Sequence, residues 1–430
     1  MKMVEGSKKA VVDTSRLFRM PWTNSDNAFS WLEVTRACDL RCGYCYQSNI
    51  AESDKSMAQI ESELRTLLRL RKTDTVFISG GEPLLHPSLS AIIRLVRSHK
   101  VKPFLVTNGH SLTPAIAGEL RKAGLMGVIF HVDSGQSRPG WMGKSEEDLN
   151  ALRQKYTDMA FREGLVVGFN TTVLPETLHE VPSIIRWTVE SIHMVSTHTL
   201  IPVRVPREDD PWELFAAGEK IDFRDTAFST NRYKNPSGIN LTADDITAQI
   251  KKVLPGFEAN AFLGGTEVPS SPKWMFSNIL GTEKKYFGNL GPRGMEMLQN
   301  GYHFLRGRFL SFLPAPLYAR AKMLFLLAAF DRELRKTVIA FLCSALKNPL
   351  QLFRKVSIQS LLVLQPQDVL PSGKQDLCDG CPNKTIYNGR MISMCRVEEF
   401  MRFGEMVDLR PKQAGAEVQK TADCACTVNR

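Results

Sequence analysis

The 430-residue sequence predicts an α/β fold, a partial (β/α)6 TIM-like barrel, over residues 30–205. Short apolar runs alternate there with amphipathic segments, which is typical of a parallel sheet whose strands are joined by helices. About six such units fit before Val205, fewer than the eight of a closed barrel. The hydrophobic fraction of 43% and the charged fraction of 23% are those of an ordinary folded protein.

The strand–helix units follow one another in a regular order. We expect strand segments within residues 31–35, 75–83, 103–109, 127–134, 166–174 and 198–205. Helical periodicity separates them around residues 57–70, 89–98, 114–123, 146–163 and 180–191. Each expected strand except the last is therefore followed by a helix, as a parallel sheet requires.

Four further regions surround the expected barrel. Residues 1–29 are an N-terminal extension, and residues 206–301 are rich in Pro, Gly, Asn and Ser. We interpret the latter as a connector with covering loops and helical pieces such as residues 243–253. Residues 302–364 form an apolar and basic helical block, and residues 365–430 a loop-rich, cysteine-bearing region.

The cysteines are unevenly distributed. The N-terminus lacks the apolar stretch and cleavage site of a secretory signal, so we expect a cytoplasmic protein. In a reducing compartment, clustered cysteines favour metal binding over disulfides. Of nine cysteines, three lie within eight residues near the start and five follow residue 377. The remaining one, Cys343, lies in the apolar run VIAFLCSAL and is expected in the core.

The first cysteine set has the spacing C-x3-C-x2-C, formed by Cys38, Cys42 and Cys45. Cysteine thiolates are the usual ligands of iron–sulfur clusters, and three ligands leave one iron open to a small molecule. Tyr44 adds an aromatic wall beside the last cysteine. A zinc site is the main alternative, but no fourth Cys or His lies close by in the sequence.

With these residues the sequence resembles the radical S-adenosylmethionine (SAM) superfamily, whose hallmark is C-x3-C-x2-C with an aromatic residue before the last Cys. The resemblance covers about residues 30–205. The motif residues Gly80, Gly81, Glu82 and Pro83 match the family's GGEP, whose backbone and Glu meet the amino group of SAM. Further matches implied by the resemblance are Thr107 and Asn108 of a TNG motif, Asp133 and Ser134 near the ribose, and Asn170 and Thr172 on the next strand.

The resemblance implies a [4Fe–4S] cluster and SAM as cofactors. In this family the reduced cluster passes one electron to SAM, which splits into methionine and a 5′-deoxyadenosyl radical that abstracts a hydrogen from the substrate. The protein orients the substrate and excludes water. A reducing partner such as ferredoxin or flavodoxin is also implied.

The second cysteine set is Cys378, Cys381 and Cys395, with Gly389 permitting a hairpin between the last two. It resembles the SPASM and twitch extensions of radical SAM enzymes, which implies a second [4Fe–4S] cluster. Cys424 or Cys426 could supply a fourth ligand, and a structural zinc held by the same cysteines remains an alternative. The GTP-cyclising enzymes of molybdenum cofactor biosynthesis share this spacing but carry arginines where this sequence has 383-Asn-Lys-Thr-385, which argues against GTP cyclisation.

The block 302–364 is both apolar and basic. Ten Lys or Arg lie between residues 302 and 355, against Asp331 and Glu333. Its apolar runs are too short to span a bilayer. We weigh a lid over the barrel mouth, a surface that contacts anionic lipid, and a surface for an acidic protein. Nucleic acid is disfavoured because the basic residues alternate with bulky aliphatic ones.

Three functions compete at this stage. The first is a radical SAM enzyme that removes a hydrogen from an apolar substrate, such as a lipid or another small molecule, with peripheral contact to the inner face of the membrane. The second is a radical SAM maturase that modifies a peptide or protein. The third, a non-catalytic iron–sulfur or zinc protein, is disfavoured because the cysteine loop and both motifs are intact. We favour the first.

Overall fold

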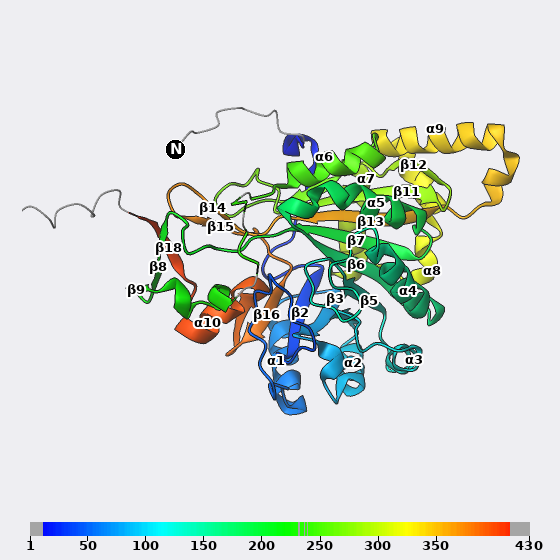
Figure 1. Cartoon of the computed structure of the whole chain (residues 1–430). Helices are drawn as coiled ribbons and strands as arrows, with labels where there is room; N and C mark the ends of the chain where they lie inside the picture. The colour runs from blue at the N-terminus through cyan, green and yellow to red at the C-terminus, as the bar shows by residue number, and fades with distance from the viewer. Residues whose placement is uncertain (1–11, 231–232, 236, 239, 413–430) are drawn as a thin grey trace, which may run out of the picture.

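The computed structural model describes residues 12–230, 233–235, 237, 238 and 240–412 (Figure 1). Within this part of the chain, one mostly parallel sheet of 11 strands forms the centre of the molecule. Six of its strands are parallel neighbours in chain order, which confirms the α/β partial barrel. They are β2 (Phe29–Thr35), β3 (Thr75–Gly80), β4 (Lys102–Thr107), β5 (Gly127–His131), β6 (Val166–Val173) and β7 (Val195–Pro202).

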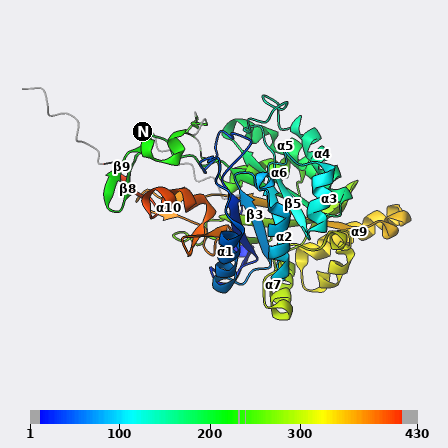
Figure 2. The same cartoon turned by 90° about the horizontal axis from the view of Figure 1, so that it is seen from below.

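Five helices connect these strands and cover one face of the sheet (Figures 1 and 2). Their bounds are α1 (Met57–Leu70), α2 (Leu89–Ser98), α3 (Pro114–Lys122), α4 (Leu149–Arg162) and α5 (Val181–Glu190). Local sequence explains where they begin. The Ser56 side chain accepts a hydrogen bond from the Gln59 N–H at the start of α1, and Pro114 occupies the first position of α3.

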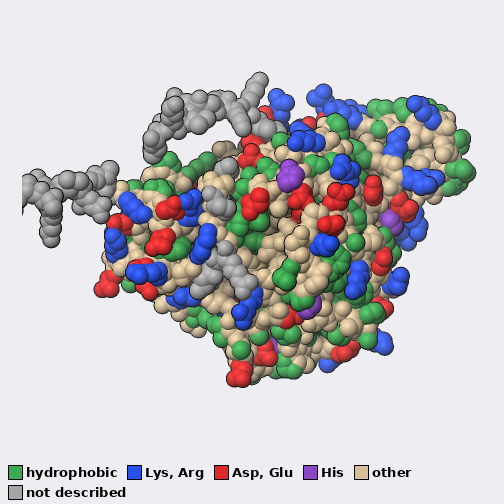
Figure 3. All heavy atoms as spheres, viewed as in Figure 1, with side chains coloured by type: hydrophobic (Ala, Val, Ile, Leu, Met, Phe, Trp, Pro, Cys, Tyr) green, Lys and Arg blue, Asp and Glu red, His purple; other side chains and the backbone are tan. Residues whose placement is uncertain are grey.

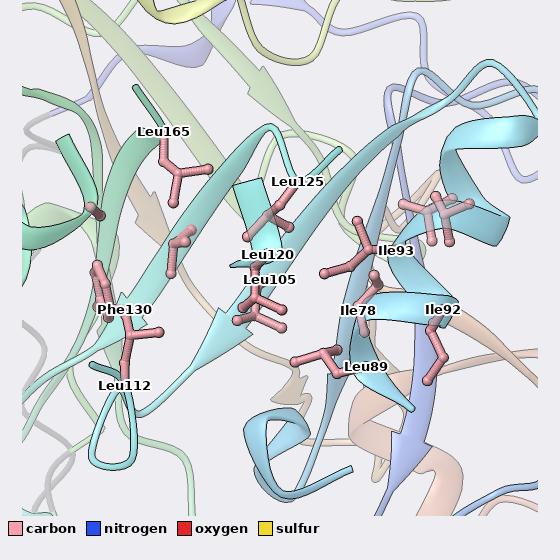
Figure 4. Packing of buried hydrophobic residues seen from close by; sticks show 14 of the residues in the cluster. Ile78, Leu89, Ile92, Ile93, Leu105, Leu112, Leu120, Leu125, Phe130 and Leu165 are labelled. Carbon is pink, nitrogen blue, oxygen red and sulfur yellow. The ribbon is translucent and has the colours of Figure 1, made fainter. Parts of the chain in front are cut away.

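Alternate strand residues build the core under these helices (Figure 4). Ile78, Leu105 and Phe130 are fully buried and pack with Ile93 and Leu120 from α2 and α3. Because side chains alternate across a strand, the intervening residues point to the inner, concave face. The site therefore depends on the inward-facing and strand-end residues.

The sheet continues beyond β7, where we expected a connector and a helical block. β13 (Ser357–Leu364) is parallel to β7, and β11 (Trp274–Thr282) is antiparallel to β13. β12 (Lys285–Asn289) and β10 (Ala261–Leu263) pair with β11, and β1 (Phe18–Arg19) pairs with β10. β10, β11 and β12 fall in the expected connector and β13 falls in the expected helical block, whereas long-range pairing makes these segments strands.

The apolar and basic block, for which a lid over the barrel mouth was one of the interpretations, lies at the other end of the barrel. Phe312 stacks on Phe104, with ring centroids 4.2 Å apart, and closes the inner face near the amino ends of the strands. The Arg308 guanidinium donates to the Thr73 and Lys100 carbonyls, which precede β3 and β4. The mouth formed by the carboxyl ends of the strands is not covered by this block, so the lid interpretation is wrong.

A projecting arm extends from this end (Figures 1 and 2). After α7 (Pro292–Arg306), it comprises α8 (Ala315–Tyr318), the 3-10 helix η6 (Ala321–Ala329), α9 (Arg332–Lys347) and the 3-10 helix η7 (Pro349–Phe353). Cys343 is exposed on α9, so its expected core position is wrong. None of the helices in the described residues combines the length and apolarity needed to cross a bilayer.

The remaining elements are further helices, small sheets and short turns. α6 (Ala243–Val253), a helix that the sequence pattern predicted, packs on α5. β8 (Trp212–Ala216) joins β9 (Glu219–Ile221) and β18 (Asp408–Pro411) in a small sheet. The C-terminal elements are β14 (Asp368–Val369), β15 (Gln375–Asp376), β16 (Lys384–Tyr387), β17 (Arg390–Ser393) and α10 (Val397–Phe403). Short 3-10 turns are η1 (Thr14–Arg16), η2 (Pro83–Leu85), η3 (Pro175–Glu180), η4 (Phe223–Asp225), η5 (Ala227–Thr230) and η8 (Met394–Arg396).

Candidate functional site

The first cysteine set lies on the loop that follows β2, held against the turn that follows β3. The Gly81 N–H donates to the Thr35 carbonyl at 2.9 Å, and the Glu82 N–H donates to the Ala37 carbonyl at 2.7 Å. A Cβ atom on Gly80 would lie 2.0 Å from the Thr35 oxygen, and one on Gly81 would lie 2.4 Å from the Ala37 oxygen. The two glycines are therefore needed where the turn meets the cysteine loop.

The three thiols of this loop share one environment. Burial is the largest influence on Cys38 and Cys42, where it raises the pKa of Cys38 to about 11 and that of Cys42 well above its usual value. The pKa of Cys45 is also raised, and the charges of Cys38 and Cys45 contribute to the rise at Cys42. No three Cys, His, Asp or Glu side chains in the described residues are grouped as ligands of a single metal ion. A four-iron cluster is larger than one ion, and three neighbouring thiols without a fourth ligand fit it.

Glu82 connects the turn after β3 to the end of β4. Its side chain is fully buried, and burial raises its pKa to about 7. The Thr107 hydroxyl donates to Glu82 Oε1 at 2.6 Å, and the Asn108 N–H donates to Oε2 at 2.7 Å. Asn108 Nδ2 donates to Asp39 Oδ1 at 2.7 Å and lies 3.9 Å from Cys38 Sγ. The network thus extends from the buried carboxylate to the cysteine loop.

A second polar group lies at the ends of β5 and β6. The Tyr44 hydroxyl donates to Asp133 Oδ1, and the Thr172 N–H donates to Asp133 Oδ2 at 3.1 Å. Burial raises the pKa of Asp133, but the neighbouring His131, 2.9 Å away, and these hydrogen bonds lower it overall. Tyr44 therefore links the cysteine loop to β5.

The other two expected residues lie beside this group. The Ser134 N–H donates to Glu146 Oε1 at 2.6 Å, and Asn170 is paired with His131 across β5 and β6. Pro83 begins the short turn η2 after Glu82. The structure therefore brings the expected residues of five consecutive strands to one edge of the sheet, as parallel strands dictate.

Sequence reasoning missed a buried ion-pair network behind the cysteine loop. Arg36 donates to Glu33 Oε1 at 3.1 Å and to Glu398 Oε2 at 2.7 Å. Glu398 also accepts from the Ser48 hydroxyl at 2.6 Å and from Arg402 at 2.9 Å. The network ties α10 to both sides of the cysteine loop. Its one sequence signal is that Glu398 follows Cys395 by three residues.

Arg138 is a second residue that the sequence did not reveal. It is buried, donates to the Asn108 carbonyl at 2.7 Å and to the Tyr156 hydroxyl at 2.9 Å. It thereby fixes the loop after β4 from the side opposite Glu82. Nothing in the local sequence of Arg138 indicates this role.

The second cysteine set is held by a hairpin beside β2. Asn388 and Gly389, with φ of 47° and 73°, form the turn between β16 and β17, as we expected of Gly389. Cys378 donates a hydrogen bond to Cys381, which lowers the pKa of Cys381 to about 6, and Cys395 lies within range of both charges. The Arg71 guanidinium donates to the Cys381 carbonyl at 3.0 Å. Cys424 and Cys426 lie outside the described residues.

A cavity beside α10 is lined by one cysteine of the second set and by the residue that follows the first set. Its lining includes Tyr46, which directly follows Cys45, together with Cys395 and Glu398. Tyr46 lies within electrostatic range of both Cys45 and Cys395. One tyrosine thus lies between the two sets.

The family model described as the radical SAM superfamily matches residues 32–188, which include the first cysteine set and both motifs. This part of the chain is a radical SAM domain. Relatives of the radical SAM domain include a GTP 3′,8-cyclase of Marinobacter nauticus, 28% identical over 36% of this chain and 48% of the relative. An AdoMet-dependent heme synthase of Methanosarcina barkeri is 26% identical over 45% of this chain and 56% of the relative. The chain spans about half the length of these curated relatives, which are enzymes.

Solved structures also resemble the chain. Streptococcus suis SuiB bound to the precursor peptide SuiA has a TM-score of 0.38 and 15% identity, over 53% of this chain and 46% of SuiB. Native anSMEcpe with bound AdoMet also has a TM-score of 0.38 and 15% identity, over 53% of this chain and 59% of that chain.

Proposed function

We propose that the protein is a radical SAM enzyme whose catalytic cluster is held by Cys38, Cys42 and Cys45. The observation that carries the proposal is the continuous hydrogen-bond network from Glu82 through Asn108 to the cysteine loop. It joins the residues expected to bind SAM to those expected to bind iron. A zinc or structural site would not require a buried carboxylate beside the thiols.

Different residues of the chain would bind the methionine and ribose parts of SAM. When bound, the cluster supplies the electron that cleaves SAM into methionine and a 5′-deoxyadenosyl radical, which removes a hydrogen atom from the substrate. Glu82 would accept hydrogen bonds from the amino group of methionine, since a buried carboxylate is stabilised by a cationic partner. Asp133, Ser134 and Asn170 provide polar groups for the ribose. A ferredoxin or flavodoxin would deliver the electron.

The second cysteine set supports a proposal of an auxiliary [4Fe–4S] cluster held by Cys378, Cys381 and Cys395. Cys378 and Cys381 interact directly, Cys395 lies within electrostatic range of them, and a tail cysteine could complete the set. About eight irons per reconstituted chain would support two clusters, and about four would leave one. Zinc retained at this site after anaerobic purification would show that the site holds a structural zinc ion and not an auxiliary cluster.

The substrate is proposed to be apolar, such as a lipid, and to be met at the inner face of the membrane. This part rests on the exposed apolar side chains of the projecting arm. The arm does not cover the mouth of the barrel, so these side chains are available to contact a membrane that holds the substrate. A peptide or protein substrate is the alternative from another class. Reaction with extracted lipids but not with cell peptides, read as substrate-dependent 5′-deoxyadenosine formation, would separate the two.

The experiment that tests the proposal compares Cys42→Ala with Cys343→Ala. Anaerobically reconstituted wild-type chain and dithionite should yield 5′-deoxyadenosine and methionine from SAM. We expect Cys42→Ala to lose this activity and Cys343→Ala, which removes an exposed thiol far from the site, to retain it. Reductive cleavage of SAM by Cys42→Ala would refute the assignment.

A further inference from the structure

The projecting arm, residues 315–355, exposes apolar and basic side chains that the candidate site does not use. We call it the basic arm. It contains α8, η6, α9 and η7 and extends from the amino-end side of the barrel (Figures 1 and 2). Its base is fixed, because the Ala321 N–H donates to the Val356 carbonyl just before β13. The arm is therefore joined to the chain directly before β13.

Helix α9 has two apolar stripes on opposite sides. Leu334, Phe341 and Ala345 are buried and face the rest of the protein. Ile339 and Leu346, seven residues apart and therefore on one side of the helix, are 55% and 85% exposed. A helix that packed on one side only would carry polar residues on the other. The second stripe therefore lacks a partner within the described residues.

The neighbouring segments expose apolar side chains as well. In η6, Met323 and Leu326 are 67% and 82% exposed and three residues apart, which places them on the same side of a 3-10 helix. In η7, Leu350 and Phe353 are 68% and 85% exposed. Single exposed apolar residues are normal, but a succession over three adjoining segments is typical of an interaction surface.

The charge of the basic arm is positive. Eight Lys or Arg lie within residues 315–355, namely Arg320, Lys322, Arg332, Arg335, Lys336, Lys347, Arg354 and Lys355. Of its two acidic residues, Asp331 is buried and accepts backbone N–H groups, and Glu333 pairs with Lys336 at 2.8 Å. Figure 3 shows basic and hydrophobic side chains together on the projection.

We propose that the basic arm docks on an anionic lipid bilayer. Its exposed Leu, Ile, Met and Phe side chains enter the headgroup region, and its Lys and Arg side chains contact lipid phosphates. A second copy of the chain is a poorer occupant, because two positive arms would face one another. The inference rests on the proposed function for the membrane location. It deepens that function by naming the surface of the protein and the residues that contact the membrane.

The test is co-sedimentation of the reconstituted full chain with vesicles. Vesicles of phosphatidylcholine and phosphatidylglycerol should bind at least about tenfold more tightly than phosphatidylcholine alone, and high salt should weaken the binding. Met323→Glu should weaken binding to the anionic vesicles about tenfold. Met142→Glu is the matched control, because Met142 is 69% exposed against 67% for Met323 but lies in the loop after β5; it should bind as wild type.

Three other outcomes would contradict docking of the basic arm on a bilayer. Equal binding to neutral and anionic vesicles, or equal effects of the two variants, would refute it. A dimer in solution that Met323→Glu dissociates would assign the arm to a second copy. Cleavage of SAM without vesicles should be the same in Met323→Glu and wild type, so failure of docking is distinguishable from failure of the proposed chemistry.

Discussion

The two ends of the partial barrel are held together by different forces. At the carboxyl ends of the strands, directional hydrogen bonds connect the cysteine loop to its neighbours, as at Glu82 and Asn108. At the amino ends, stacked aromatic rings such as Phe104 and Phe312 fill the interior. Hydrogen bonds fix angles, whereas apolar burial fixes mainly volume. Substitutions at the first end should therefore affect chemistry, and those at the second end stability.

The largest expected effect on stability is at the amino end. Phe104 is fully buried and touches Phe77 and Phe312. Phe104→Ala should lower the free energy of unfolding by about 3–5 kcal/mol, because it leaves a cavity among packed rings. Denaturant unfolding measures it. A loss below about 1 kcal/mol would mean that the aromatic filling does not hold this end together.

A smaller effect, confined to chemistry, is expected at the carboxyl end. Gly81→Ala would place a Cβ 2.4 Å from the Ala37 oxygen and push the cysteine loop away. Iron bound at the first cysteine set should be lost, and the rate of 5′-deoxyadenosine formation should fall about 100-fold, which corresponds to about 2.7 kcal/mol. The control is Gly301→Ala on α7, where a Cβ meets no atom within 4 Å and which should leave both unchanged. Unchanged iron content in Gly81→Ala would contradict the close approach.

The smallest effect concerns the link from α10 to the cysteine loop. Glu398→Gln removes the charge from a buried hydrogen bond with Arg36 and should cost about 1.5–3 kcal/mol at pH 7. Burial raises the pKa of Glu398, but hydrogen bonds from Ser48, Arg402 and Arg36 lower it to about 2.

This depressed pKa gives the prediction a pH dependence. A carboxyl group with a depressed pKa stabilises the fold above its unfolded value of 4.5, and the contribution is lost as the pH falls towards 2. The stability difference between wild type and Glu398→Gln should therefore shrink below pH 4.5. A difference that stays constant down to pH 3 would show that the carboxylate does not stabilise the loop.

The sequence predicted the six parallel strands and their helices because local periodicity determines them. Helices α1 and α2 have the expected bounds. It did not predict β11 and β13, since their pairing joins segments about 80 residues apart, and loop closure of that kind leaves no local pattern.

The candidate site shows the same division. Motif residues such as Glu82 and Asn108 were recognisable because they stand in the GGEP and TNG motifs of the superfamily that the sequence resembles. Arg138 and the pair Arg36–Glu398 were not, since their partners lie 30 and 362 residues away. Tyr44 was expected as an aromatic wall, but its hydrogen bond to Asp133 required the fold.

The most direct test is electron paramagnetic resonance of the reduced, reconstituted protein with and without SAM. In a Cys381→Ala/Cys395→Ala variant, which retains the first cysteine set, addition of SAM should change the spectrum of the remaining cluster. The same change should be absent in Cys42→Ala. A spectrum that SAM leaves unaltered in the double variant would contradict a SAM-binding cluster at the carboxyl end of the barrel.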